Sequence, residues 1–174
     1  MHHFIFPTAD SWISSGSNVE TTGISQRDQN YGQDEILELK KFFYNDSFDH
    51  ETRVLINFAG EEFNQLSQSI MDGTIPHAST GLTKYYLRLY EAEGNQELST
   101  EYELQTFPLS QSWDEGRGKF GNNPKVIDGV SWENRENKPG SNPVTWSRVH
   151  ADGSDVRLHA CNFITASGFI GGAS

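Results

Sequence analysis

The chain has 174 residues, a length typical of one globular domain of about 100–200 residues. Its 24 Asp and Glu against 13 Lys and Arg give a net charge of -11, and so acidic a chain without a cationic cluster is not expected to bind nucleic acid. Glycine and aromatic residues are plentiful and methionine is scarce, which favours strands and turns over helices.

The N-terminal sequence MHHFIFPTADSWISS lacks the basic and apolar stretches of a signal peptide. No segment approaches the roughly 18 apolar residues of a membrane span, so we expect cytoplasmic synthesis and no membrane partner. Cys161 is the one cysteine of the chain, which excludes an intrachain disulfide and a cysteine zinc site. It is predicted to be a small buried side chain.

Apolar residues at alternate positions predict strands within EILELKKFF (35–43), TRVLINF (52–58) and KYYLRLY (84–90). Because alternate side chains of a strand point to the same face, we expect one face of each strand to lie on the core. The residues that this pattern assigns to the core are Leu37, Leu39, Phe43, Val54, Ile56, Phe58, Tyr85, Leu87 and Leu89.

The sequence EEFNQLSQSIM (61–71) predicts the one helix, with apolar residues at i, i+3 and i+7 behind acidic residues that favour a helix N-terminus. Two more strands are predicted in TEYELQTF (100–107) and DVRLHACNF (155–163). Loops rich in Gly, Asn, Pro and Ser separate these elements, without a βαβ rhythm. We therefore expect an all-β fold, an antiparallel β-sandwich or jelly roll with long loops and one short helix, in a single domain over residues 1–174.

A tryptophan-rich stretch, LSQSWDEGRGKFGNNPKVIDGVSW (109–132), raises the question of catalysis. Asp114 and Glu115 could be a glycosidase pair, but such a pair needs carboxyl groups roughly 5–9.5 Å apart on either side of the substrate. Adjacent strand residues point to opposite faces, so we favour Trp113 in the core and Asp114 or Glu115 as a turn cap. Without a nucleophile elbow or a nucleotide-binding motif, the chain is not expected to be an enzyme.

The succession ADSWISSGS, NYGQDEILEL, TRVLINF, YYLRLY, SWDEG and VTW resembles the DNRLRE family over about residues 8–146. These are disaggregatase-related β-sandwich modules that look like carbohydrate-binding modules. Within the family, the chain looks most like the copies in tailed-bacteriophage virion proteins.

That resemblance implies a virion structural protein, made in the host cytoplasm, that acts as a capsid decoration, neck or tail component. Its partners would be copies of itself and other virion proteins. Family members continue after VTW with further strands, to which SGFIGG (167–172) is a poor match. We expect shortened C-terminal strands and a neighbouring chain that completes the sandwich, because open edges and uncovered faces are seldom tolerated.

A carbohydrate-binding module that attaches a particle or an enzyme to surface polysaccharide is the alternative function. Trp12, Trp132 and Trp146 could form a flat platform for sugar rings, but large aromatic rings more often fill a core, which we favour for Trp12 and Trp146. Tyrosines are expected to be better exposed, particularly those opposite the core face of KYYLRLY. The candidate sugar-binding residues are Tyr31, Tyr86, Tyr90 and Trp132.

A structural calcium ion is the one cofactor left open, because related sandwiches often carry one. The candidate ligands are Asp46 and Asp49 in NDSFD, and Asp28 and Asp34 in RDQNYGQD. Neither segment follows a defined calcium loop such as the EF-hand. We favour solvated loop acids and expect no metal site.

Overall fold

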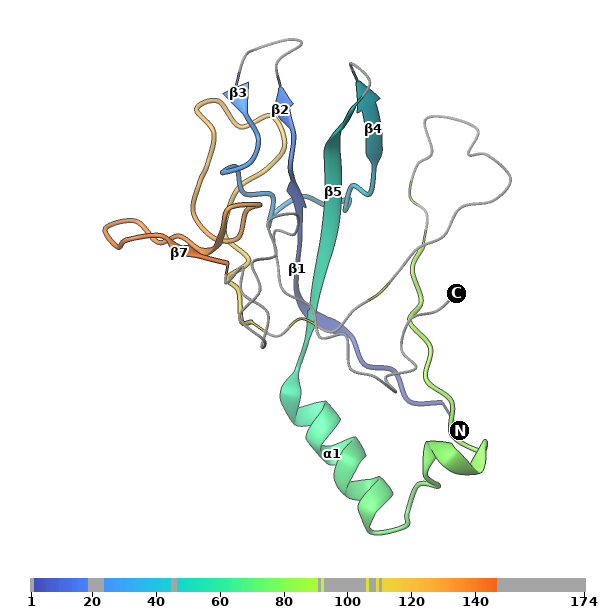
Figure 1. Cartoon of the computed structure of the whole chain (residues 1–174). Helices are drawn as coiled ribbons and strands as arrows, with labels where there is room; N and C mark the ends of the chain where they lie inside the picture. Colours follow the sequence, from blue (N-terminus) through green and yellow to red (C-terminus); the bar gives the residue numbers. More distant parts are fainter. Residues whose placement is uncertain are drawn as a thin grey trace, which may run out of the picture. The chain divides into compact units, whose positions relative to one another are not determined.

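The structure, a computed structural model, describes residues 2–18, 24–44, 47–90, 92, 106, 109 and 111–146 (Figure 1). The chain divides into two compact units: unit 1 comprises Met1–Ala9 and Ile56–Glu97, and unit 2 comprises Asp10–Leu55 and Leu98–Ser174. None of the helices in the described ranges is long and apolar enough to cross a membrane.

Strands outnumber helices in the described ranges, as the composition predicted. Three strands form one sheet in the order β1-β5-β4, and two antiparallel pairs form the others, β2 with β3 and β6 with β7. In the antiparallel β4–β5 pair, Lys41 lies opposite Glu51 and Phe42 opposite His50. The strands are β1 (Pro7–Ser14), β2 (Ser17–Asn18), β3 (Ile24–Ser25), β4 (Lys41–Tyr44), β5 (Ser47–Phe58), β6 (Asn134–Glu136) and β7 (Val144–Thr145).

The strand predictions have different outcomes. TRVLINF is a strand, the second half of β5, whereas EILELKKFF is a strand only from Lys41 on and KYYLRLY is neither strand nor helix. Apart from Thr106, the predicted strands at 100–107 and 155–163 lie outside the described residues, as does Cys161. A β-rich chain with one short helix is therefore confirmed at the level of secondary structure.

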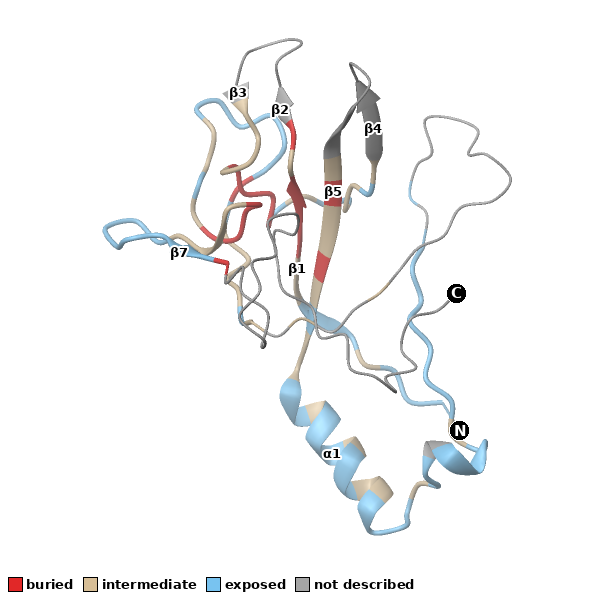
Figure 2. Ribbon diagram, in the orientation of Figure 1, coloured by how far each residue is buried: buried red, intermediate tan, exposed pale blue. Residues whose placement is uncertain are grey.

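The predicted helix is confirmed as α1 (Gly60–Met71), which a 3-10 helix, η1 (Ala78–Thr80), follows. Glu61 and Glu62 lie in the first turn of α1, where the helix dipole favours negative charge. No residue of α1 is buried, and Figure 2 shows its surface as exposed or half-buried. The Phe63 ring meets Phe58 of β5 edge-on, with 6.1 Å between the ring centroids, so the apolar stripe of α1 is only partly covered.

The core lies in unit 2, where buried residues of β1 and β5 meet buried loop residues (Figure 2). The prediction that Trp12 and Trp146 are buried is confirmed, and Trp113 packs half-buried against the cluster. The Trp146 indole N–H donates to the Ser131 carbonyl over 2.9 Å, so its polar edge is satisfied. The buried apolar residues are Trp12, Ile13, Tyr31, Leu55, Val130, Trp132 and Trp146.

Several predicted core positions are wrong. Leu39, Leu87 and Leu89 are exposed, because no assigned strand holds them against the core. Among residues 51–58 of β5, whose side chains the structure describes, the buried ones are Thr52 and Leu55, which lie on opposite faces of the strand. No single face of this part of the strand is therefore buried throughout. Tyr85, which the same pattern assigned to the core, is also exposed, and the side chain of Phe43 lies outside the described residues. The remaining predicted core residues of these segments are half-buried, namely Leu37, Val54, Ile56 and Phe58.

Candidate functional site

A fully buried asparagine, Asn30, joins three loop segments of unit 2. Its Nδ2 donates to the carbonyl oxygens of Glu115 (2.7 Å) and Val130 (2.8 Å). Its Oδ1 accepts from the backbone N–H groups of Gly32 (3.2 Å) and Gly118 (2.6 Å). Both donors and both acceptor positions of the amide are thereby used. We call this arrangement the Asn30 centre.

Glycines surround the Asn30 centre because there is no space for a side chain. A Cβ on Gly118 would overlap the Asn30 carbonyl oxygen, and one on Gly116 would overlap the Asp128 carbonyl oxygen. Gly116 also has a φ of 83°, a conformation that side chains disfavour. The glycines of the centre are Gly32, Gly116, Gly118 and Gly129. These residues were not predicted from the sequence, although the density of Gly and Asn in QNYG and GRGKFG is a signal for them.

Beside this centre, Tyr31 is fully buried under Trp12, so the prediction that it is exposed is wrong. The two rings stack with centroids 3.7 Å apart and an interplanar angle of 16°. The Trp12 indole N–H donates to Asp34 Oδ2 over 2.8 Å, and Asp34 Oδ1 accepts from the Phe120 backbone N–H, also over 2.8 Å. Tyr31 therefore presents no ring face to a sugar.

The Tyr31 hydroxyl is buried and has no hydrogen-bond partner in the described part of the chain. Burial raises the pKa of this phenol above its ordinary value, and the negative charges of Glu38, Asp34 and Asp28 raise it further. The folded chain thus holds Tyr31 neutral.

We expect Tyr31→Phe to raise the free energy of unfolding at pH 7 by up to about 1 kcal/mol, because it removes a buried hydroxyl without a partner. Since the Tyr31 pKa is raised in the folded state, the unfolded chain loses the phenolic proton first, and the stability of the wild-type chain falls as the pH rises above about 10. Urea unfolding at pH 7 and at alkaline pH should therefore show a smaller alkaline loss for the variant. Tyr86→Phe, at an exposed ring, is the control; a loss of stability in Tyr31→Phe at pH 7 would contradict the assignment.

The calcium candidates have other partners where the structure describes them. Asp28 Oδ1 lies 2.6 Å from Lys125 Nζ, and Asp34 bonds the Trp12 indole and the Phe120 backbone. Asp46 and the side chain of Asp49 lie outside the described residues. Within the described ranges, no three His, Cys, Asp or Glu side chains lie together as a metal site.

The two carboxylates after Trp113 have separate structural partners. Asp114 Oδ2 lies 2.8 Å from Lys138 Nζ, whereas Glu115 Oε1 accepts from the Asp10 backbone N–H of β1 over 3.0 Å. Hydrogen bonds to Asp114 and Glu136 raise the pKa of Lys138 above its ordinary value. Asp114 and Glu115 thus fasten different segments.

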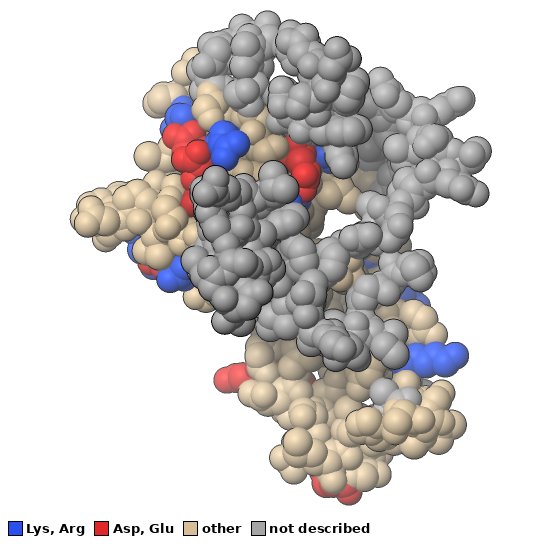
Figure 3. All heavy atoms as spheres, viewed as in Figure 1, with Lys and Arg blue, Asp and Glu red and all other residues tan. Residues whose placement is uncertain are grey.

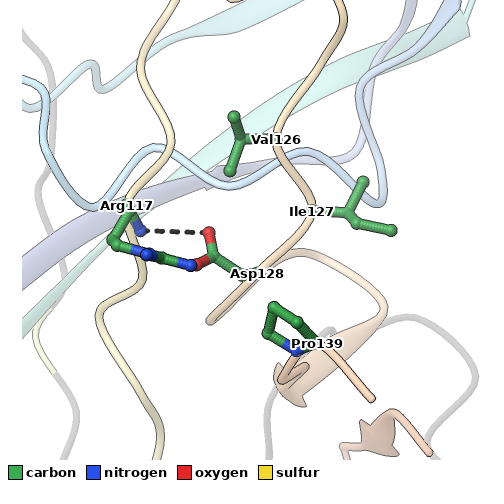
Figure 4. A pocket seen from close by; sticks show the side chains of 5 residues that line it. All are labelled: Arg117, Val126, Ile127, Asp128 and Pro139. Carbon is green, nitrogen blue, oxygen red and sulfur yellow. Dashed lines mark hydrogen bonds and ion pairs between the residues drawn. The ribbon is translucent and has the colours of Figure 1, made fainter. Parts of the chain in front are cut away.

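A depression of about 370 Å³ on unit 2 is lined by Arg117, Val126, Ile127, Asp128 and Pro139 (Figure 4). Arg117 Nε donates to Asp128 Oδ2 over 2.7 Å, and the Arg117 backbone N–H donates to Asp128 Oδ1 over 3.2 Å. The one acid of the lining is therefore engaged by the one base. No hydroxyl, thiol or imidazole occurs among these five lining residues.

Ion pairs fasten the loops of unit 2 at the surface. Arg27 Nε lies 3.1 Å from Glu133 Oε1. In the face drawn in Figure 3, basic and acidic side chains of the described residues lie beside one another. Each such half-exposed pair contributes roughly 0–1 kcal/mol to the stability of the fold.

Trp132, a candidate sugar-binding residue, is buried. The Arg53 guanidinium lies 4.8 Å from its ring centroid, so the ring is covered.

In unit 1 the predicted exposure of Tyr86 and Tyr90 is confirmed, at 75% and 85%. The exposed fraction of the side chains alternates along this segment. Tyr85, Leu87 and Leu89 are less exposed, at 58%, 50% and 56%. The four candidate sugar-binding residues therefore belong to different units. Tyr86 and Tyr90 lie in unit 1, and Tyr31 and Trp132 lie in unit 2.

Lys84 and Arg88 occupy the same alternate positions as Tyr86 and Tyr90, and both are exposed. The Arg88 guanidinium lies 5.8 Å from the Phe4 ring centroid. These two cations were not predicted as site residues, although their spacing is visible in KYYLRLY.

Comparisons with protein-family models, characterised proteins and solved structures found no match for this chain.

Proposed function

We propose that this chain is a virion structural protein of a tailed phage, a DNRLRE-like β-sandwich subunit that holds its neighbours by surface contacts. The observation that supports this proposal lies in unit 1, where two segments, residues 4–6 and 82–90, carry large apolar side chains that are at least half exposed. These side chains are Phe4, Phe6, Leu82, Tyr85, Leu87 and Leu89. Clustered exposed apolar side chains mark interaction surfaces in soluble proteins.

The expected mechanism is burial of this apolar surface between copies of the chain. Removing apolar surface from water contributes about 25 cal/mol per Å², and specific interfaces commonly bury about 1,200–2,000 Å² in total. The net charge of -11 opposes non-specific association. Only a contact with good complementarity then forms.

Sedimentation equilibrium over a wide concentration range tests the proposal. We expect the wild-type chain to associate, and a Phe6→Ser/Leu82→Ser double variant to associate at least about tenfold more weakly, because it loses two apolar contacts. Met71→Ser is the matched control, since Met71 is as exposed as Leu82 but lies at the end of α1. A wild-type chain that stays monomeric at every concentration, or a double variant that associates like the control, refutes the subunit contact.

Polysaccharide binding is the second candidate function, and the exposure of Tyr86 and Tyr90 favours it. Their rings can stack on sugars while Tyr85, Leu87 and Leu89 contact a neighbouring subunit, because alternate residues of an extended segment point to opposite sides. The two functions are therefore compatible. A phage fibre or tail component would use the second to attach the particle to a surface glycan.

A further inference from the structure

Four side chains at alternate positions along residues 84–90 are all exposed. They alternate between cation and phenol in the order Lys84, Tyr86, Arg88 and Tyr90. Figure 1 draws this part of the chain as an extended trace that leads away from η1. We call these four residues the cation–tyrosine face.

The charge of this face is opposite to that of the chain as a whole. Residues 82–90 contain two cations and no acid, whereas the net charge of the chain is -11. Cations elsewhere, such as Arg27, Lys125 and Lys138, lie in ion pairs. Within the described ranges, neither Lys84 nor Arg88 forms an ion pair. The positive charge of the face is thus available to an external anion.

Arg88 is partly positioned before any ligand arrives. Its guanidinium lies 5.8 Å from the Phe4 ring centroid, within the range of a cation–π interaction. Such a contact reduces the side-chain entropy that binding would otherwise cost. A guanidinium held in this way can still pair with a carboxylate through its remaining N–H groups.

We propose that the cation–tyrosine face binds an acidic polysaccharide. Tyr86 and Tyr90 stack on sugar rings, and Lys84 and Arg88 pair with carboxylate groups on the sugars. Alternate residues of an extended chain are spaced by about 6.6–6.8 Å, which places a cation beside each ring. This inference rests on the proposed polysaccharide-binding function and adds to it the charge class of the ligand and the two residues that select it.

A nucleic acid is a poorer fit to the same face. Tight binding to a phosphate backbone uses many cations, commonly about 6–10 contacts, and this face has two. A DNA duplex carries one charge per about 1.7 Å, so the net charge of -11 repels it more strongly than a polysaccharide with at most one carboxylate per sugar. Screening over about 8 Å at physiological salt weakens this long-range repulsion, while the two cations still act on carboxylates in direct contact.

Affinity electrophoresis in gels that contain polygalacturonate, alginate or hyaluronate tests the inference, with dextran and methyl-esterified polygalacturonate as uncharged comparisons. We expect retardation by at least one acidic polymer. Lys84→Gln/Arg88→Gln should weaken it by at least about tenfold, since each variant residue loses a charge-assisted hydrogen bond. Tyr86→Ala/Tyr90→Ala should abolish it. Lys119→Gln, at an exposed lysine of unit 2, should leave it unchanged.

The other outcomes separate the two claims. Equal retardation by acidic and uncharged polymers, lost only in the tyrosine variant, would leave polysaccharide binding in place and overturn the acidic class. Equal binding of a single-stranded oligonucleotide would overturn the glycan in favour of a general polyanion site. Retardation by none of the polymers would overturn both claims, while the self-association measured by sedimentation would stand or fall by itself.

Discussion

Gly116→Ala is expected to lower the free energy of unfolding by at least about 3 kcal/mol. The added methyl group would overlap the Asp128 carbonyl oxygen and crowd the Asn30 side-chain amide, and the backbone φ of 83° disfavours any side chain. Relieving this overlap requires movement of two loop backbones, and that movement also breaks the hydrogen bonds of Asn30. Urea unfolding followed by tryptophan fluorescence measures the loss.

Gly121 provides a matched control for the conformational part of this effect. Its φ of 81° is nearly the same as that of Gly116, but a Cβ there meets nothing within 4 Å. Gly121→Ala should therefore cost only the left-handed strain, roughly 1–2 kcal/mol. The difference between the two variants is the cost of crowding. Equal losses would show that the loops around Gly116 are not packed as described.

Asn30→Ala should lower the free energy of unfolding by about 3–5 kcal/mol, because it leaves two carbonyl oxygens and two backbone N–H groups buried without their partner. These four hydrogen bonds, to Glu115, Val130, Gly32 and Gly118, are lost together. Asn64→Ala, at an exposed residue of α1, is the control and should change the value by at most about 0.5 kcal/mol.

A second variant at the same position tests the direction of the hydrogen bonds. Asn30→Asp keeps the shape of the side chain but places a carboxylate against the Glu115 and Val130 carbonyl oxygens. Burial and this repulsion raise the pKa of the introduced carboxyl, so the destabilisation should be greatest at neutral pH and smaller as the pH falls and the group is protonated. A loss that does not depend on pH would contradict the buried position.

The residue pattern was sufficient to predict the elements that depend on local periodicity. The helix at 61–71 and the strand at 52–58 formed as expected, because neighbouring residues decide helix and strand periodicity. The exposure of Tyr86 and Tyr90 followed from the same alternation. Burial of Trp12 and Trp146 also agreed, since large aromatic rings mostly fill cores.

The sequence by itself thus determined a β-rich chain with one short helix, the burial of Trp12 and Trp146, and the exposure of Tyr86 and Tyr90. Only the tertiary structure decided that Asn30 and Tyr31 are buried, because burial of a polar group depends on partners that the local sequence does not contain. The partners of Asn30 include Glu115, 85 residues away, and Val130, 100 residues away. For the same reason, periodicity could assign Leu87 and Leu89 to one side of a segment but could not decide whether another element covers that side.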